Sequence, residues 1–336
     1  MGKTTLFLNG EILTANPKDE LCDAMLIEEE KIVFVGQQED ALSLADADTE
    51  MIDLDKRAVI PGFINTAPSY YFVESQDVEA LERRALEIRM LGWTTLRLSQ
   101  TALGTLRHLV AEGELTSFRA PQLFLFYERA ELLAERCRIS HFAGKTLEDE
   151  AAGRQLEWAI SDRRPISLES DGAESVTDLL SFFASLRLQS RSGMRNRIYL
   201  REPLPEKYLP LLFLRRLIPI FLGNGSACAE SVLALREAGI PAVLACEECI
   251  SPLAMMSSLL TAVDADYRSV PPLLSALSRH AAELESVGEE VGSLEWGKKA
   301  DFLILSSPLI GCAPNRLSEL KIAESWIGGE RLFKPC

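Results

Sequence analysis

The sequence predicts an α/β protein: a TIM-like (β/α)8 barrel with a small β-sandwich formed by the N- and C-terminal segments. Short apolar runs alternate with helical stretches in the middle of the chain, and both ends hold short strands. A chain of 336 residues is long enough for one large domain with a smaller one attached. We therefore expect a composite β-sandwich from residues 1–57 and 291–336, docked on a β/α barrel over residues 58–290.

The N-terminal segment consists of short predicted strands. In TLFLNGEILTA, Asn9-Gly10 stands between two apolar runs, which is a strong hairpin signal. A second hairpin is predicted in AMLIEEEKIVFVG, with its turn at Glu29-Glu30 and its last strand ending at Gly36. The stretch MIDLDKRAVIPGFI then adds a short strand and a longer buried run. Together these strands predict one part of a small sandwich.

From residue 58 onward, buried runs alternate with helical periods, which is the pattern of a parallel β/α barrel. Helical periods over 78–91 and 231–238 end beside Gly92 and Gly239, where the C-terminus of a helix is expected. The eight predicted barrel strands are 58–64, 93–98, 122–127, 138–143, 165–170, 197–201, 217–222 and 241–246.

The C-terminal segment returns to strands after one more helical stretch, PPLLSALSRHAAELESVG. The stretches VGSLEWGKKADFLILSSP and ESWIGGERLFKP predict strands, with a hairpin turn at Gly328-Gly329. We expect Trp296 and Trp326 to pack within the sandwich. Because both ends of the chain are predicted to be β, the economical arrangement joins them in one sandwich.

Composition limits the possible functions. The net charge of −15 and the lack of a basic stripe argue against nucleic-acid binding, and no apolar run is long enough to predict a membrane span. Seven scattered cysteines predict no disulfide framework, which fits a reducing cytoplasm. Only three histidines, His108, His141 and His280, are available for metal chemistry. The expected partner is a small molecule in the barrel mouth, and a homo-oligomer is an open alternative.

Several stretches resemble the amidohydrolase superfamily. EEEKIVFVG, IDLDKRAVIPGFIN, LREAGIPAVLACEE and VGSLEWGKKADFLIL carry the resemblance, and LGWTTLRL, LVAEGELTSFRA and ISLESDGAESVTDLLSFFASL resemble its family 3, the YtcJ-like group. The resemblance covers nearly the whole chain and implies a barrel with a split β-sandwich. It also implies hydrolysis of carbon–nitrogen bonds with one or two divalent metals at the barrel mouth. The chain is shorter than is usual for the group, and the loop region after the first barrel strand is largely missing.

The resemblance also shows where metal ligands would be expected. It places a His-x-His pair at Ala67 and Ser69, a third histidine at Glu169, a fourth at Leu200, and the last acidic ligand at Glu247. Ala67 has no donor atom, and a neutral serine hydroxyl is a weak ligand. Two carboxylates alone hold a hard cation such as Mg²⁺ weakly and do not form a tight zinc site. We therefore expect no metal and no other cofactor, and the alternative is a divalent metal.

These residues favour a catalytically inactive homologue that acts as a binding or scaffold protein. The alternative is an active amidohydrolase or deaminase with an atypical metal site, or with Glu169 or Glu247 as a general base. A folded remnant with no selected activity is a third interpretation. No catalytic residue is assigned beyond these two carboxylates. The residues expected to line a charged pocket at the strand ends are Asn65, Ala67, Ser69, His141, Glu169, Arg201 and Glu247.

Overall fold

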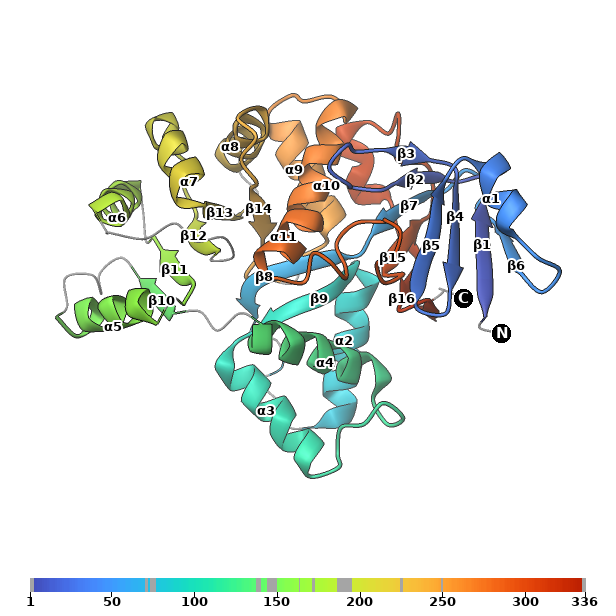
Figure 1. The fold of residues 1–336 in the computed structure, drawn as a ribbon, viewed down its shortest axis with the longest axis horizontal. Helices are drawn as coiled ribbons and strands as arrows, with labels where there is room; N and C mark the ends of the chain where they lie inside the picture. The colour runs from blue at the N-terminus through green and yellow to red at the C-terminus, as the bar shows by residue number, and fades with distance from the viewer. Residues whose placement is uncertain are drawn as a thin grey trace.

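The chain folds into a barrel of parallel strands with outer helices, beside a β-sandwich that is built from both ends of the chain (Figure 1). This is the fold class that the sequence predicts. The computed structural model describes residues 3–69, 72, 77–136, 140–143, 150–162, 164–170, 173–185, 195–223, 226–248 and 250–333. In the described chain, no helix is both long and apolar enough to cross a membrane.

The sandwich has two layers. One sheet has the strand order β5-β4-β1-β6, and the other has the order β17-β16-β15-β7-β2-β3. The predicted hairpins at Glu29-Glu30 and Gly328-Gly329 are confirmed, because β4 pairs with β5 and β16 pairs with β17 in antiparallel register. The bounds are β1 Thr4–Leu8, β2 Glu11–Leu13, β3 Leu21–Cys22, β4 Ala24–Glu28, β5 Lys31–Gly36, β6 Glu50–Asp53, β7 Ala58–Pro61, β15 Phe302–Leu305, β16 Ile322–Ile327 and β17 Glu330–Phe333, with helix α1 at Gln38–Leu44.

Aromatic side chains fill the space between the two sheets. Phe7 meets Phe302 and Trp326 edge-on, with ring centroids 5.2 and 5.1 Å away, and Phe302 stacks on Trp326. Such pairs add to the free energy gained by burying the rings. Trp326 therefore packs as predicted. The prediction for Trp296 is wrong: this side chain is 78% exposed, because it lies in a turn outside both sheets.

The predicted hairpin at Asn9-Gly10 is also wrong. β1 pairs with β4 and β6, whereas β2 pairs with β3 and β7 in the other sheet. Asn9 has a positive φ of 54°, as in a tight turn, but the turn carries the chain from one layer to the other. A Cβ on Gly10 would lie 2.3 Å from the Cδ1 methyl of Leu54, so a larger residue here would push that side chain aside. A turn signal predicts the reversal and does not tell which sheet receives the next strand.

The barrel strands that the structure describes fall into two parallel groups. One is the pair β8-β9, and the other has the order β10-β11-β12-β13-β14. The predicted first barrel strand is divided, because β7 joins the sandwich sheet and β8 alone enters the barrel. The bounds are β8 Phe63–Ser69, β9 Trp93–Leu98, β10 Ser140–Ala143, β11 Ile166–Glu169, β12 Asn196–Leu200, β13 Leu217–Leu222 and β14 Val243–Ala245.

The predicted strand 122–127 is wrong, because this run lies in helix α4, Pro121–Arg136. Its buried residues follow helical spacing: Leu123, Phe126, Ala130 and Leu133. The helix packs against β9. A short apolar run fits a buried strand and a buried helix equally well by periodicity. In the described chain, β9 and β10 are not hydrogen-bonded to each other, and no strand lies between them. The ring of barrel strands is therefore open at this point (Figure 1).

Helices cover the outside of the barrel. Gly92 and Gly239 follow α2 and α8 with positive φ values of 101° and 68°, which confirms the predicted helix ends. The last helix, α11, packs against β8 and β14, and its alanines join the apolar interior of the barrel. The bounds are α2 Val78–Met90, α3 Gln100–Ala111, α5 Glu150–Ser161, α6 Ala173–Ser185, α7 Leu209–Arg215, α8 Ser226–Glu237, α9 Pro252–Ala262, α10 Val270–Leu277 and α11 Arg279–Leu284, with short 3₁₀ turns η2 Glu206–Tyr208, η3 Tyr267–Ser269 and η4 Pro314–Glu319.

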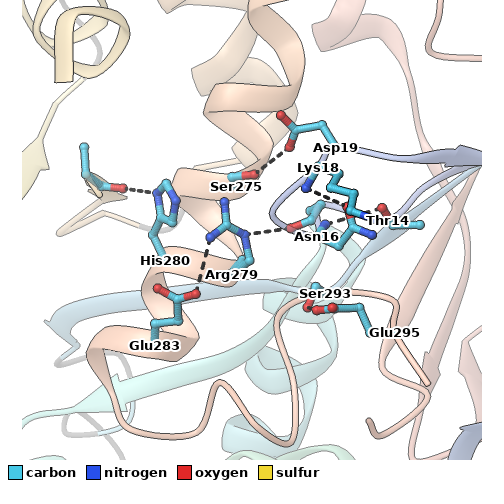
Figure 2. Close-up of polar contacts among 12 residues, drawn as sticks. Thr14, Asn16, Lys18, Asp19, Ser275, Arg279, His280, Glu283, Ser293 and Glu295 are labelled. Carbon is cyan, nitrogen blue, oxygen red and sulfur yellow. Dashed lines mark hydrogen bonds and ion pairs between the residues drawn. The ribbon is translucent and has the colours of Figure 1, made fainter. Parts of the chain in front are cut away.

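Polar contacts hold the sandwich on the barrel. Figure 2 shows the turn between β2 and β3 reaching α10 and α11. The Arg279 side chain donates to the carbonyl oxygen of Ala15 at 2.9 Å, and the Ser275 hydroxyl donates to Asp19 at 3.4 Å. Asp19 also forms an ion pair with Arg236 of α8. Three barrel helices thus fix one sandwich turn.

Candidate binding site at the barrel mouth

Three of the predicted site residues meet at the carboxyl ends of the barrel strands. Glu169 ends β11, Arg201 follows β12 and Glu247 follows β14. The Arg201 guanidinium lies 2.5 Å from Glu247 Oε1 and 3.2 Å from Glu169 Oε1. The carboxyl ends of parallel strands carry the functional loops in barrels of this kind. In the structure, one guanidinium joins these side chains.

Arg201 is the centre of this cluster. Partial burial lowers the pKa of Arg201, but the neighbouring Glu247 and Glu169 carboxylates outweigh it, so the pKa is raised overall. The side chains of Arg201, Glu169 and Glu247 are 38, 32 and 55% exposed. The Arg201 guanidinium thus stays charged, and all three side chains are partly exposed to solvent.

Two other predicted residues, Asn65 and Ala67, are buried on β8. The Asn65 amide donates to the Cys246 carbonyl oxygen at 2.8 Å, and its oxygen accepts from the backbone nitrogens of Cys246 and Ala67. These bonds join β8 to the end of β14 and close that side of the barrel. Asn65 therefore holds the mouth together, and Ala67 contributes only a methyl group.

The remaining predicted histidine and serine positions are located only by their backbone. Ser69 ends β8, and His141 lies on β10 beside Ser167 of β11. Their side chains lie outside the described part of the structure. His108 is on the exposed surface of α3.

His280 lies at the opposite end of the barrel. It is on α11, and its Nδ1 donates to the carbonyl oxygen of Ala242, just before β14, at 2.9 Å (Figure 2). Burial, together with the neighbouring Arg279 charge, lowers the pKa of His280 to about 4. His280 is thus a neutral structural histidine, remote from the mouth.

The described strand ends do not fit a divalent metal centre. Ala67 offers no donor atom, and the Arg201 cation occupies the space between the two carboxylates. A guanidinium in that place repels a metal ion and uses the oxygens that would bind it. Among the residues that the structure describes, no group of three or more His, Cys, Asp or Glu side chains is placed to hold a metal ion.

A buried ion cluster inside the barrel is not predicted from the sequence. Glu285, just after α11, binds Arg97 of β9 and Arg197 of β12. Its Oε1 accepts from Arg97 Nε and from Arg197 Nη1, each at 2.8 Å, and its Oε2 accepts from Arg97 Nη2. Glu285 is fully buried. Burial raises the pKa of Glu285, but the two arginines outweigh it and hold the pKa at about 2. The available signal was an arginine inside each of two apolar strands, in WTTLRL and in RIYLR.

Comparisons with known proteins agree on the architecture. No protein-family model matches the chain. Solved structures match it over nearly the full length: an adenosine deaminase with bound zinc from Xanthomonas campestris, 15% identical, covers 98% of this chain and 93% of its own with a TM-score of 0.66. The guanine deaminase of E. coli, 13% identical, covers 100% of both chains with a TM-score of 0.63. This chain has the amidohydrolase fold.

One more solved structure and one curated protein are similar to the chain. An amidohydrolase from Thermotoga maritima, 13% identical, covers 98% of this chain and 100% of its own with a TM-score of 0.62. Among curated proteins, the exoenzymes regulatory protein AepA of Pectobacterium carotovorum is 32% identical over 62 residues, which is 18% of this chain and 13% of that protein. The amidohydrolase fold is therefore shown by structure, whereas the sequence similarity is confined to a short stretch.

Proposed function

We propose that the protein is a metal-free, catalytically inactive homologue of the amidohydrolases that binds a small molecule at the barrel mouth. The observation that carries the proposal is the Arg201 guanidinium lying 2.5 Å from Glu247 and 3.2 Å from Glu169. A hydrolase of this fold needs a metal to activate water and polarise the substrate. An ion-paired arginine supplies neither a water nucleophile nor an open coordination position.

The finer assignment is to family 3, the YtcJ-like group, with the metal-ligand histidines replaced and the loop after the first barrel strand shortened. Its support is the set of quoted stretches together with Ala67, Glu169, Leu200 and Glu247 at the positions where that group has ligands. We propose a cytoplasmic location, supported by the scattered cysteines.

A calorimetric metal titration tests the proposal. The wild-type protein is titrated with Zn²⁺ and Mn²⁺, beside the variant Arg201→Gln, which removes the cation and keeps both carboxylates. We expect no site-specific heat from the wild type. The variant gains weak divalent binding, because two carboxylates then face one space without a competing charge. Tight binding of one metal ion by the wild type at the mouth would overturn the proposal.

An activity screen tests the alternative in which a carboxylate acts as a general base. Amide hydrolysis and nucleobase deamination are assayed with and without added metal. We expect no turnover above that of a matched sample of heat-denatured protein. Turnover that disappears in Glu169→Gln or Glu247→Gln, but persists in the surface variant Glu319→Gln, would establish an active enzyme instead.

A further inference from the structure

A cavity lies at the open side of the barrel, and none of Glu169, Arg201 and Glu247 lines it. Its volume is about 350 Å³. Its walls come from the end of β9, from α3 and α4, and from Arg164 between α5 and β11. This is the side on which α4 takes the sequence position of the predicted third strand. The cavity is thus a consequence of the open ring between β9 and β10.

The walls of this cavity carry three arginines. Arg97, Arg107 and Arg164 line it, together with one acidic side chain, Glu135. The cavity thus concentrates guanidinium donors within an acidic protein of net charge −15. Buried or half-buried arginines with their planar donor groups are well suited to carboxylates and phosphates.

The carboxylate partners of these arginines do not line the cavity. Arg97 binds Glu285 through Nε and one terminal nitrogen, and Glu285 is shared with Arg197. Two guanidinium groups therefore share one carboxylate in the barrel interior. The Arg97 side chain is 11% exposed, and it is among the groups that line the cavity.

Arg107 and Arg164 are each fixed by an acidic residue that does not line the cavity. Arg107 makes two hydrogen bonds to Glu131 of α4, and the second of them, from Nη2, is 2.8 Å long. Arg164 bonds Asp162 at 2.6 Å and lies 4.2 Å above the Trp158 ring. Guanidinium groups fixed in this way lose little conformational entropy when a ligand binds. The first residue of α3, Gln100, adds a helix N-terminus to the same wall.

Most of the exposed lining is polar, and the apolar part is small. Leu98, Leu103 and Leu133 line the cavity beside the arginines, and all three are largely buried. They offer a small apolar contact for the carbon body of a ligand whose acidic group meets the arginines.

We propose that this cavity between β9, α3 and α4 binds a small organic anion, whose carboxylate or phosphate group is held by Arg97, Arg107 and Arg164. The aliphatic part of the ligand packs on the three leucines. None of the three residues of the mouth cluster lines this cavity, so the proposal does not rest on the absence of a metal there. A metal found at the mouth would overturn the proposed function and leave this site unaffected.

Calorimetry on the full chain tests the proposal with four named probes. Glutarate and butyl phosphate share a short carbon body and differ in the acidic group, inorganic phosphate has no carbon body, and butylammonium has the opposite charge. We expect saturable binding of glutarate or butyl phosphate, and none of butylammonium. Arg107→Gln and Arg164→Gln each weaken that binding by about tenfold, as expected for loss of one charge-assisted hydrogen bond.

Two controls keep the result interpretable. Arg316→Gln removes an exposed arginine paired with Glu319 and should leave the affinity unchanged. Arg97 is left intact, because its removal would leave Glu285 buried without one partner and could unfold the protein. Binding of glutarate alone or of butyl phosphate alone identifies which acidic group the site takes. No saturable binding of either organic anion, or binding that both cavity variants leave unchanged, would overturn the proposal, as would equal binding of inorganic phosphate in wild type and variants.

Discussion

Glu285 carries a negative charge into the barrel interior, where it meets Arg97 and Arg197. Replacing it with glutamine would leave two buried guanidinium groups without a carboxylate. We expect Glu285→Gln to lower the free energy of unfolding by about 3–5 kcal/mol, as for other broken buried ion pairs. Urea unfolding followed by circular dichroism measures the loss.

The matched control for this substitution is Glu319→Gln, which removes an exposed carboxylate that is paired with Arg316. We expect a loss of less than about 1 kcal/mol for that variant. Equal effects of the two substitutions would contradict a special role of Glu285 in the barrel interior.

His280 and Glu285 predict how stability depends on pH. The pKa of His280 is lowered to about 4 from 6.5, so the unfolded chain takes up a proton as the pH falls below 6.5 while the folded chain does not. Folding stability is therefore lost from pH 6.5 down to 4, by about 2 kcal/mol between pH 7 and pH 5. The pKa of Glu285 is about 2 in the folded chain and 4.5 as its ordinary value. Folding stability therefore falls further as the pH drops from about 4.5 to about 2.

Urea unfolding at pH 7 and pH 5 checks this pH dependence. His280→Gln should remove most of the difference between the two values, and His108→Gln, at the surface of α3, should retain it. An unchanged pH dependence in His280→Gln would show that other groups cause it.

Glu169, Arg201 and Glu247 lie at or beside the ends of predicted strands, and the carboxyl ends of parallel barrel strands meet at one end of the barrel. Their pairing through Arg201 depends on side-chain directions that no local pattern specifies. Glu285 was missed because its partner Arg97 lies 188 positions away in the chain.

At the scale of elements, α4 shows where prediction from the sequence ends. The run from Gln122 to Tyr127 has the length and composition of a buried strand, and the helical spacing appears only when Ala130 and Leu133 are included. Packing against β9 decides between the two. The other barrel strands were found because turn signals and glycines bound each apolar run.

Replacing Gly104 and Gly92 with alanine should have opposite effects on stability, because one lies inside a helix and the other follows a helix with a positive φ. Gly104 is inside α3, and a Cβ there would meet nothing within 4 Å. We expect Gly104→Ala to raise the free energy of unfolding by roughly 0.5–1 kcal/mol, because alanine favours the helix.

Gly92 follows α2 with a φ of +101°, and a Cβ would lie 3.0 Å from Phe63 and 3.1 Å from Leu303. Gly92→Ala should therefore lower the free energy of unfolding by more than about 1 kcal/mol. Urea unfolding of both variants gives the comparison. Stabilisation by both substitutions would show that Gly92 does not hold the strained turn described here.

For the whole molecule, the two chain ends predicted the sandwich and the alternating middle predicted the barrel. The order of strands within the sandwich was not predictable, because Asn9-Gly10 signals a turn whether the next strand stays in the sheet or crosses to the other one. The cavity at the open side of the barrel was not predictable either, because it is formed by α4 together with arginines on separate elements.

We propose that an arginine held between two carboxylates stands at the barrel mouth in place of a metal centre. The decisive measurement is elemental mass spectrometry of protein purified without chelators, after growth with added zinc, iron and manganese. We expect only traces of transition metal, before and after dialysis. One equivalent of zinc, iron or manganese per chain, lost on substitution of Glu169 or Glu247, would refute the proposal.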